Sequence, residues 1–571
     1  RSRTLTMTKN CKGQEALDLS YLADYISLVE EHKYPYCAEQ YQLIDYVKRM
    51  FLSEDIYIDV AQAEKYFSYE KYFPFGLFPW EKFVFVLHNC TYTASGSLRW
   101  PVLFLYVGRG TGKNGYLGFE DFCLLTPTNG IKHYNIDIFA TTEDQAETTF
   151  KDVYNVLEDN RDKMQRFFYW NKEVIINLKT KSELKFRTSS PRSADGARPG
   201  KVDHDEVHAY ENSKLIDVAV GGLGKVPRPR RTIMSTDGFV REGPLDKEKA
   251  KGIRILNGEI EDNGMLPFIA RVDSPEEVEM PEMWYKANPS LQYLPDLLQE
   301  MKTEFQNYLD DKISNISFAV KRMNCLPQQT EGGITAFDNI LATNQDITPY
   351  LSKLQGRQCT AGFDYMKTDD FLSAGLLFDV DGTDVWITHT WVCKASADLP
   401  RIKAPLQEWE AAGLLSFVDG PEIPPEIPVI WVAQKAAELN AKVAMTGIDN
   451  YRYTLLRRAL KENLYASDEK GYGNIMLVRP SNEMMIMPVI TSQLVNHKLA
   501  VGDNPLFRWA MNNTKVCTSS AGNMTYGKIE PKSRKTDPFK AYVAAKAAQN
   551  KIAEQISSMP MGKSVMNVFT Y

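Results

Sequence analysis

The 571-residue sequence lacks long apolar runs: no stretch approaches the ~20 residues of a membrane-spanning helix, and no signal peptide is visible. It also lacks a C-x-x-C pair, because its eight cysteines are scattered, which argues against a zinc site and a disulfide framework. A formal net charge of −6 excludes a uniformly basic surface. We therefore expect an intracellular globular protein, not secreted and with no membrane contact, whose length predicts three or four domains.

A glycine-rich turn follows an apolar run of strand length at residues 101–114, PVLFLYVGRGTGKN. Its backbone N–H groups, the charge of Lys113 and the positive end of a following helix all favour an anion, so the pattern predicts a loop that binds a nucleoside triphosphate. The match to G-x-x-x-x-G-K-[ST] fails at Val107 and at Asn114, where a hydroxyl would hold Mg²⁺. The residues expected to bind phosphate are Gly108, Arg109, Gly110, Thr111, Gly112, Lys113 and Asn114.

Two further segments complete an ATPase pattern in the expected order. In KVDHDEVH, residues 201–208, Asp205 would hold Mg²⁺ and Glu206 would orient or deprotonate the attacking water. The strand before this pair is poorly apolar, and an isolated Asp-Glu pair is more often a solvated loop. In RTIMSTDG, residues 231–238, a short buried strand ends in Ser235 and Thr236, whose hydroxyls are able to sense the γ-phosphate.

Strand-like and helical runs define the organisation of the chain. We predict an N-terminal helical region at 1–75, an α/β ATPase domain with a mostly parallel sheet at 76–240, a connector subdomain at 241–350 and a second α/β domain at 351–571. In the second α/β domain, a hairpin is expected to turn at Asp381-Gly382.

Acidic residues recur in the second α/β domain at positions that a fold brings together. Asp364 lies in a first strand, Asp449 ends a later strand, and Asp537 opens an alanine-rich helix, the arrangement by which a ribonuclease-H-like fold clusters metal ligands. Two Mg²⁺ held there would activate water and stabilise the leaving oxygen of a phosphodiester. Asp369 or Asp370 would complete the site. Each Asp taken alone is more often a cap or loop residue; Asp537 before Pro538 is also a good N-cap.

A basic stretch at 528–535, KIEPKSRK, precedes Asp537 and could grip a phosphodiester backbone, although such runs are as often solvated loops. The predicted DNA contacts are Lys528, Lys532, Arg534 and Lys535.

An ATPase followed by a nuclease resembles the large subunit of tailed-bacteriophage terminases. The blocks DEVHAYEN (205–212), WYKANPSL (284–291), VKRMNCL (320–326) and DNPLFRWAMNN (503–513), followed by Lys528 and Asp537, are similar to that family's recurring segments and occur in the same order. The resemblance covers about residues 35 to 550.

The resemblance implies roles for individual residues. Arg109 matches a loop arginine that contacts phosphate within its own subunit, and Asp370 matches a further metal-binding acid. Arg192 and Arg198 are candidates for an arginine donated to a neighbouring subunit. Glu81 stands where a glutamine that reads adenine is expected, and its carboxylate cannot donate to adenine N7, which puts base selectivity in doubt.

The resemblance also implies the activity. We expect a motor that uses ATP and Mg²⁺ to move double-stranded viral DNA into a procapsid, and an endonuclease that cuts concatemers with Mg²⁺, for which Mn²⁺ can substitute. Its expected partners are a small terminase subunit, the portal protein and further copies of itself in a ring, in the host cytoplasm while docked on the procapsid. The alternatives are a repair or restriction translocase-nuclease, and a capsid-associated scaffold with a decayed nucleotide site.

Overall fold

The computed structural model divides the chain into two compact units, Arg1–Pro327 and Gln328–Tyr571, and each is described by itself. The structure describes residues 13–187, 198–210, 212–312, 315–325, 333–365, 371–402, 404–450, 452–468, 473–518, 524–529 and 532–557. The seven cysteines in these ranges are free. Within the same ranges, no helix is both long enough and apolar enough to cross a membrane.

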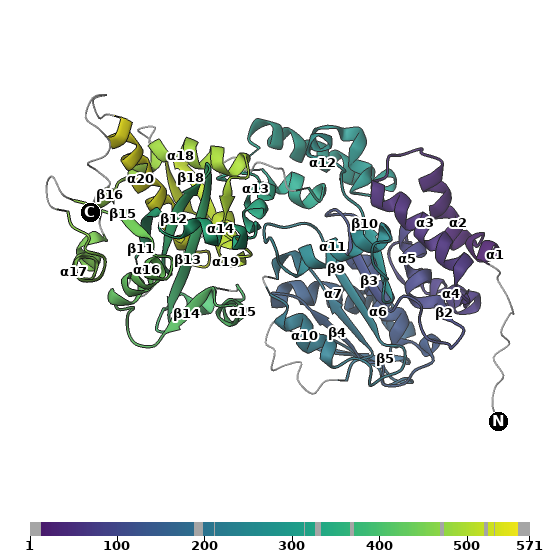
Figure 1. The fold of residues 1–571 in the computed structure, drawn as a ribbon. Coiled ribbons are helices and arrows are strands. Elements are labelled where there is room, and N and C mark those ends of the chain that lie inside the picture. Colours follow the sequence, from purple (N-terminus) through teal and green to yellow (C-terminus); the bar gives the residue numbers. More distant parts are fainter. Residues whose placement is uncertain are drawn as a thin grey trace. The chain divides into compact units, whose positions relative to one another are not determined.

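An eight-stranded sheet forms the centre of the first unit, in the order β10-β3-β9-β8-β4-β7-β6-β5 (Figure 1). The five pairs from β10 to β7 are parallel, and the two pairs at the β5 edge are antiparallel. This confirms the predicted mostly parallel α/β fold. The strands are β3 (Val102–Tyr106), β4 (Ile136–Phe139), β5 (Phe168–Trp170), β6 (Ile175–Asn177), β7 (Glu183–Arg187), β8 (Lys201–His204), β9 (Arg230–Ser235) and β10 (Met265–Ile269).

Helices cover this sheet, and their ends follow local sequence signals. α5 (Pro79–Cys90) begins with proline in its first turn, and the Glu81 carboxylate accepts the Phe78 N–H, which satisfies one of the free donors at a helix start. α6 (Lys113–Leu125), α7 (Glu143–Asp159) and α11 (Pro244–Leu256) follow strands of the sheet.

The N-terminal helices join the same core. α2 (Ser20–Glu30) packs on α5, and α3 (Ala38–Ser53) buries an apolar face that includes Ile44, Val47 and Phe51. The remaining elements of this region are α1 (Gly13–Leu17), β1 (Ile56–Ile58), α4 (Val60–Phe67) and β2 (Thr91–Thr93).

The segment after α11 contributes both to the sheet and to a small core of its own. β10 pairs with β3 at one edge, and residues beyond it form short helical turns, α12 (Pro295–Asp310) and a π-helical turn, η7 (Phe318–Arg322). Trp284, Phe305 and Phe318 pack against one another in this core. This segment supplies the backbone against which the glycine-rich loop rests.

The second unit is built on a seven-stranded mixed sheet in the order β14-β13-β12-β11-β15-β16, with β17 paired to β13. β11 is antiparallel to β12 and parallel to β15, and Asp381 and Gly382, at φ of 56° and 81°, form the turn of the β12–β13 hairpin. The strands are β11 (Gln358–Asp364), β12 (Leu372–Val380), β13 (Thr383–Cys393), β14 (Leu415–Val418), β15 (Lys442–Asp449), β16 (Ile475–Val478) and β17 (Leu499–Ala500).

Alternate residues of its strands face two different helical layers. Leu376 and Phe378 pack with α16 (Glu426–Glu438) and α17 (Tyr453–Leu464), whereas Leu377 packs with α18 (Pro480–Val495), α19 (Pro505–Asn512) and α20 (Asp537–Ser557). β18 (Thr514–Thr518) and β19 (Met524–Lys528) form a hairpin before α20.

Candidate active sites

The glycine-rich loop connects β3 to α6, with Lys113 as the first residue of the helix. Gly110 and Gly112 have φ of 91° and 105°, a region that glycine enters without steric cost, so the loop folds back over the start of α6. The Gly108 N–H donates to the Ala287 carbonyl at 2.8 Å, and the Arg109 N–H donates to the Lys321 carbonyl at 2.7 Å. The segment that follows β10 therefore anchors the loop.

Lys113, Asp205 and Glu206 meet at the carboxyl ends of β3 and β8. The Lys113 Nζ lies 3.2 Å from Glu206 Oε1, and the Asn114 amide nitrogen lies 3.5 Å from Asp205 Oδ2. Glu206 has a left-handed backbone, with φ of 50°, and its N–H donates to Asp205 Oδ1 at 2.8 Å. A non-glycine residue in this conformation is strained, and such strain often accompanies function.

The two acids have opposite electrostatic character. Burial and the neighbouring charge of Glu206 raise the pKa of Asp205 to about 7, against the effect of Lys113. Burial also opposes ionisation of Glu206, but a hydrogen bond from His208 and the charge of Lys113 outweigh it and lower its pKa to about 2. A divalent cation would compensate the buried Asp205 carboxylate, so this oxygen donor fits Mg²⁺.

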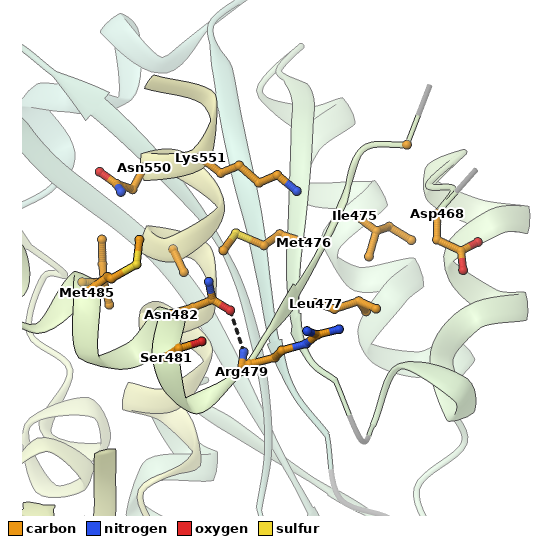
Figure 2. Close-up of a pocket in the computed structure, with 13 residues that line it drawn as sticks. Asp468, Ile475, Met476, Leu477, Arg479, Ser481, Asn482, Met485, Asn550 and Lys551 are labelled. Carbon is orange, nitrogen blue, oxygen red and sulfur yellow. Dashed lines mark hydrogen bonds between the residues drawn. The ribbon is translucent and has the colours of Figure 1, made fainter. Parts of the chain in front are cut away.

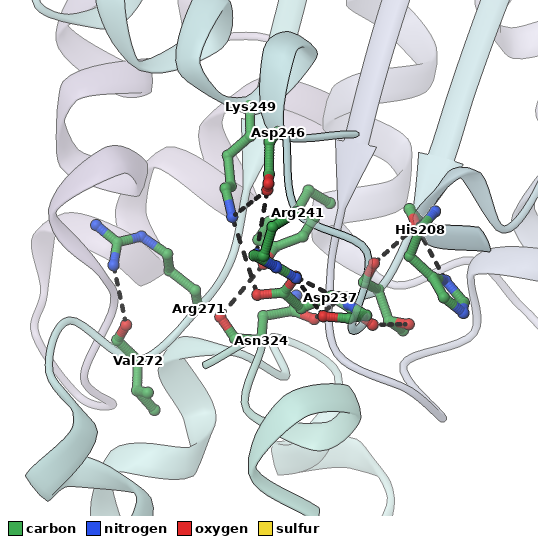
Figure 3. Close-up of polar contacts among 12 residues, drawn as sticks. His208, Asp237, Arg241, Asp246, Lys249, Arg271, Val272 and Asn324 are labelled. Atoms are coloured by element: carbon green, nitrogen blue, oxygen red, sulfur yellow. Dashed lines mark hydrogen bonds and ion pairs between the residues drawn. The ribbon is translucent and has the colours of Figure 1, made fainter. Parts of the chain in front are cut away.

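Ser235 and Thr236 lie between the loop and the acidic pair, because β9 separates β3 from β8 in the sheet. Both side chains are buried, and their hydroxyls donate to the carbonyls of Thr236 at 2.7 Å and Asp237 at 3.1 Å. The Asp237 N–H donates to Asn324 Oδ1 at 2.9 Å, and its carboxylate pairs with Arg241 at 2.6 Å (Figure 3).

Arg109 and Glu81 flank the loop. The Arg109 side chain is exposed and lines a cavity of about 230 Å³, and its carbonyl accepts from Arg322 Nη1 at 2.9 Å. Glu81 is buried near Gly112, and burial raises its pKa well above the usual range of a glutamate. Burial therefore favours the neutral form of the Glu81 side chain, which can donate a hydrogen bond as well as accept one.

The polar character of β8 has a structural cause that the sequence pattern did not reveal. The Lys201 ammonium lies 2.8 Å from Glu120, 2.5 Å from Asp121 and 2.7 Å from Asp203, and all four side chains are fully buried. We call these four residues the Lys201 cluster. In the described part of the chain, its three acids form a group of potential metal ligands whose oxygen atoms lie within 4.8 Å of one another, but the Lys201 ammonium already lies among them. The cluster joins α6 to β8 inside the domain, so the charged residues of β8 are buried ion-pair partners and do not face solvent.

Arg198 and Arg192 are the two arginines that the resemblance assigns to a neighbouring subunit's site. Arg198 is exposed and precedes β8, so it lies at the amino end of this strand, whereas the glycine-rich loop lies at the carboxyl end of the parallel strand β3. Arg192 lies outside the described residues.

The predicted nuclease acids converge on one edge of the second sheet. Phe363 and Ile448 are paired in the parallel β11–β15 ladder, so Asp364 and Asp449 end adjacent strands. Gly362 and Gly447 face the α20 backbone at Ala541 and Ala544, where a Cβ would collide, and the Thr360 hydroxyl donates to the Ala545 carbonyl at 3.0 Å. α20 therefore runs antiparallel to these strands.

This direction brings the first residue of α20, Asp537, to the ends of the two strands. Oxygen donors from two strand ends and a helix start fit hard divalent cations. The carboxylate oxygens of Asp364, Asp449 and Asp537, all of them described residues, do not all lie within 4.8 Å of one another. Asp370, like Asp369, lies outside the described residues.

The four basic residues predicted to bind DNA differ in exposure. Lys528 ends β19 with its ammonium 3.5 Å from Asp537 Oδ2, Lys532 is exposed, and Arg534 is partly exposed. Lys535 is 1% exposed and its ammonium lies 2.7 Å from Asp398 Oδ2. A buried, paired ammonium does not face DNA, so we correct the prediction by removing Lys535 from the set.

A separate cavity of about 720 Å³ lies beside β16, the start of α18 and the later turns of α20 (Figure 2). Arg479, Asn482 and Lys551 contribute to its polar wall. Lys551 lies 14 residues after Asp537, which is roughly 21 Å along a helix. None of the predicted site residues lines this cavity.

The first unit is thus a P-loop-type ATPase domain and the second a ribonuclease-H-like α/β domain. Two family models match the chain: "Terminase large subunit, ATPase domain" at residues 79–252 and "Terminase large subunit, endonuclease domain" at residues 259–408. The two matches together span more than half of the 571 residues. The chain belongs to the terminase large subunit family, and it carries the ATPase and the nuclease of a viral DNA-packaging motor.

Individual proteins that resemble this chain have low sequence identity to it. Protein YmfN of Escherichia coli (strain K12) is 23% identical over 338 residues, covering 56% of this chain and 71% of that protein. The crystal structure of the HK97 bacteriophage large terminase is 16% identical, with a TM-score of 0.44, over 85% of this chain and 99% of that one. The large terminase ATPase domain of a Thermus phage is 17% identical, with a TM-score of 0.21, over 34% of this chain and 85% of that one.

Proposed function

We propose that ATP is bound and hydrolysed at the carboxyl ends of β3 and β8 by residues in distinct roles. The loop from Gly108 to Asn114, with Lys113, binds the phosphates. Asp205 is the Mg²⁺ ligand, with the Asn114 amide oxygen as a weaker second donor. Mg²⁺ bound there would neutralise the charge that develops on the phosphates during hydrolysis.

Glu206 is the proposed base. Its carboxylate lies beside Lys113, so phosphate oxygens drawn to the lysine would place the attacking water next to Glu206. The buried surroundings strengthen each of these interactions relative to water. Ser235 and Thr236, at the end of the strand between the two site strands, connect this centre to the Asp237 ion pairs. Arg109 adds positive charge at the loop.

We propose further that Asp364, Asp449 and Asp537, with Asp370, hold the metal ions of the nuclease. Mg²⁺ bound by these acids, or Mn²⁺ in its place, would activate water and stabilise the leaving oxygen of the phosphodiester. Lys528, Lys532 and Arg534 precede α20, where positive charge would hold a DNA backbone of any sequence.

The partners are proposed from the family. They are double-stranded viral DNA, a small terminase subunit, the portal protein and further copies of this chain in a ring, in the host cytoplasm at the procapsid. In a ring, Arg192 or Arg198 would reach the neighbour's nucleotide.

The observation that supports the ATPase roles is the gathering of Lys113, Asp205 and Glu206 at one sheet edge. The test combines nucleotide binding, ATP turnover and plasmid cleavage on purified variants. Lys113→Ala should weaken nucleotide binding, because a charge on the β- and γ-phosphates is lost. Glu206→Gln should bind ATP and stall, because it keeps the shape and removes the base.

The nuclease roles are tested on the same samples. Asp364→Ala should stop plasmid cleavage and leave ATP turnover intact, whereas Asp419→Ala, at an exposed acid of the same unit, should change neither. Equal loss of nucleotide binding in Lys113→Ala and Glu206→Gln would contradict the ATPase roles. Normal cleavage by Asp364→Ala would contradict the nuclease roles.

A further inference from the structure

We propose that His208 is a positioning residue of the ATPase reaction, which holds Glu206 on the side opposite to Lys113 and ties it to Ser235 on β9. The inference rests on the proposed role of Glu206 as the base. It adds a residue for which the sequence motifs assigned no role.

His208 follows Glu206 in a single 3-10 turn, η3 (Val207–Ala209), which begins directly after the left-handed Glu206. Its Nδ1 lies 2.8 Å from Glu206 Oε2, while Glu206 Oε1 lies 3.2 Å from the Lys113 ammonium. Each carboxylate oxygen therefore has its own partner, and the two partners come from different elements.

The hydrogen-bond pattern assigns the proton of the imidazole. Ser235 Oγ donates its hydrogen to the Thr236 carbonyl at 2.7 Å and accepts the backbone N–H of His208 at 2.9 Å. His208 Nδ1 faces this oxygen at 3.3 Å and the Glu206 carboxylate at 2.8 Å. Both are acceptors, so Nδ1 carries the hydrogen and donates it.

The ring itself is held by contact with a glycine. A Cβ at Gly238 would lie 2.7 Å from His208 Cβ and 2.8 Å from Cδ2, closer than carbon atoms approach. Gly238 follows Asp237, whose ion pairs and hydrogen bond to Asn324 fix this loop (Figure 3). The position of the imidazole is thus set by the end of β9.

This arrangement has a consequence for catalysis. When phosphate attracts Lys113, the bond from Nδ1 to Oε2 still orients the carboxylate, so Oε1 remains directed at the space beside the lysine. Oε1 is then the oxygen that accepts the proton of the attacking water. Loss of the donor leaves the carboxylate free to rotate, and misplacement of a catalytic group by about 1 Å costs up to ~100-fold in rate.

The experiment measures kcat, KM and nucleotide Kd of the full chain, with thermal melting to verify folding. His208→Ala should lower kcat about 10- to 100-fold and leave Kd within about twofold, because phosphate binding does not use the imidazole. His208→Asn places an amide N–H near the position of Nδ1 and should recover most of the rate. His32→Ala, at an exposed histidine of the same unit, should match the wild type.

Gly238→Ala provides an independent perturbation that leaves the histidine in place. Its methyl group should displace the ring and lower kcat. In His208→Gly, which removes both the Cβ and the ring that the methyl group would meet, it should add little, so the double-mutant cycle of Gly238→Ala and His208→Gly is strongly non-additive. Additive losses, or an Asn variant as slow as the Ala variant, would overturn the proposal.

Glu206→Gln separates the two hypotheses. If it is inactive while His208→Ala turns over ATP at the wild-type rate, the positioning role is wrong and the base assignment stands. If Glu206→Gln retains turnover, the proposed base is itself wrong.

Discussion

Replacing Lys201 by methionine is the most informative test of how the ATPase domain is built. The substitution keeps an unbranched side chain and removes the ammonium that ion-pairs with all three of Glu120, Asp121 and Asp203. The pKa of Lys201 is raised because the attraction of the three carboxylates outweighs the effect of burial, so the wild-type lysine is charged throughout the neutral range.

The expected loss of stability is large. Removing one partner from a buried ion pair costs about 3–5 kcal/mol, because the remaining charge has neither water nor a counter-ion. At about 2.1 cal/mol/K per residue, the unfolding entropy of the Arg1–Pro327 unit is about 0.7 kcal/mol/K, so we expect a fall of roughly 4–7 °C in the melting temperature. Part of the cost is relieved when the acids take up protons.

Thermal unfolding followed by circular dichroism measures this effect, with Lys179→Met at an exposed position as the control. A quadruple variant that also carries Glu120→Gln, Asp121→Asn and Asp203→Asn should recover much of the loss, because neutral amides replace unpaired charges. A Lys201→Met protein that melts within about 2 °C of the wild type would refute the reasoning, since a buried charge imbalance cannot be that cheap.

Three further predictions concern Asp237, Glu81 and the basic residues that precede α20. The charges of Lys249 and Arg241 outweigh the effect of burial and lower the pKa of Asp237 to about 2. The ionised carboxylate therefore stabilises the fold fully above pH 4, and this contribution of up to about 2 kcal/mol is lost as the pH falls toward 2. In urea unfolding, Asp237→Asn should lose less stability than the wild type between pH 5 and pH 2.5. Glu81→Gln should keep ATP affinity within about threefold in nucleotide titrations, because the neutral form that burial favours at Glu81 donates and accepts hydrogen bonds as an amide does. A tenfold loss of affinity would contradict this prediction. Neutralising Lys528, Lys532 and Arg534 should flatten the slope of log DNA affinity against log salt concentration by about three, and it should lower the affinity for DNAs of unrelated sequence to the same extent. An unchanged slope would place the DNA contacts elsewhere.

The sequence by itself determined the local features. The apolar run before Gly108 and the glycines at 110 and 112 predict a strand, a tight loop and a helix start, because backbone freedom and hydrogen-bond geometry act within a few residues. The order of the nucleotide-binding and acidic motifs, together with the recurring blocks, sufficed to predict the family. The sequence also predicted which strands and which helix carry Asp364, Asp449 and Asp537, because local sequence signals mark where each of these elements begins or ends.

The tertiary structure decided the environment of each charged group. Nothing near Lys201 in the sequence shows that acids of α6 surround it, and the basic run around Lys535 does not reveal its ion pair with Asp398. The proposed role of His208 depends on Ser235, the last residue of β9, and on Gly238 in the loop after it, which lie about 30 residues away in the sequence. Burial and Coulomb interactions depend on distances in space, and only the packing of the sheet and its helices sets those distances.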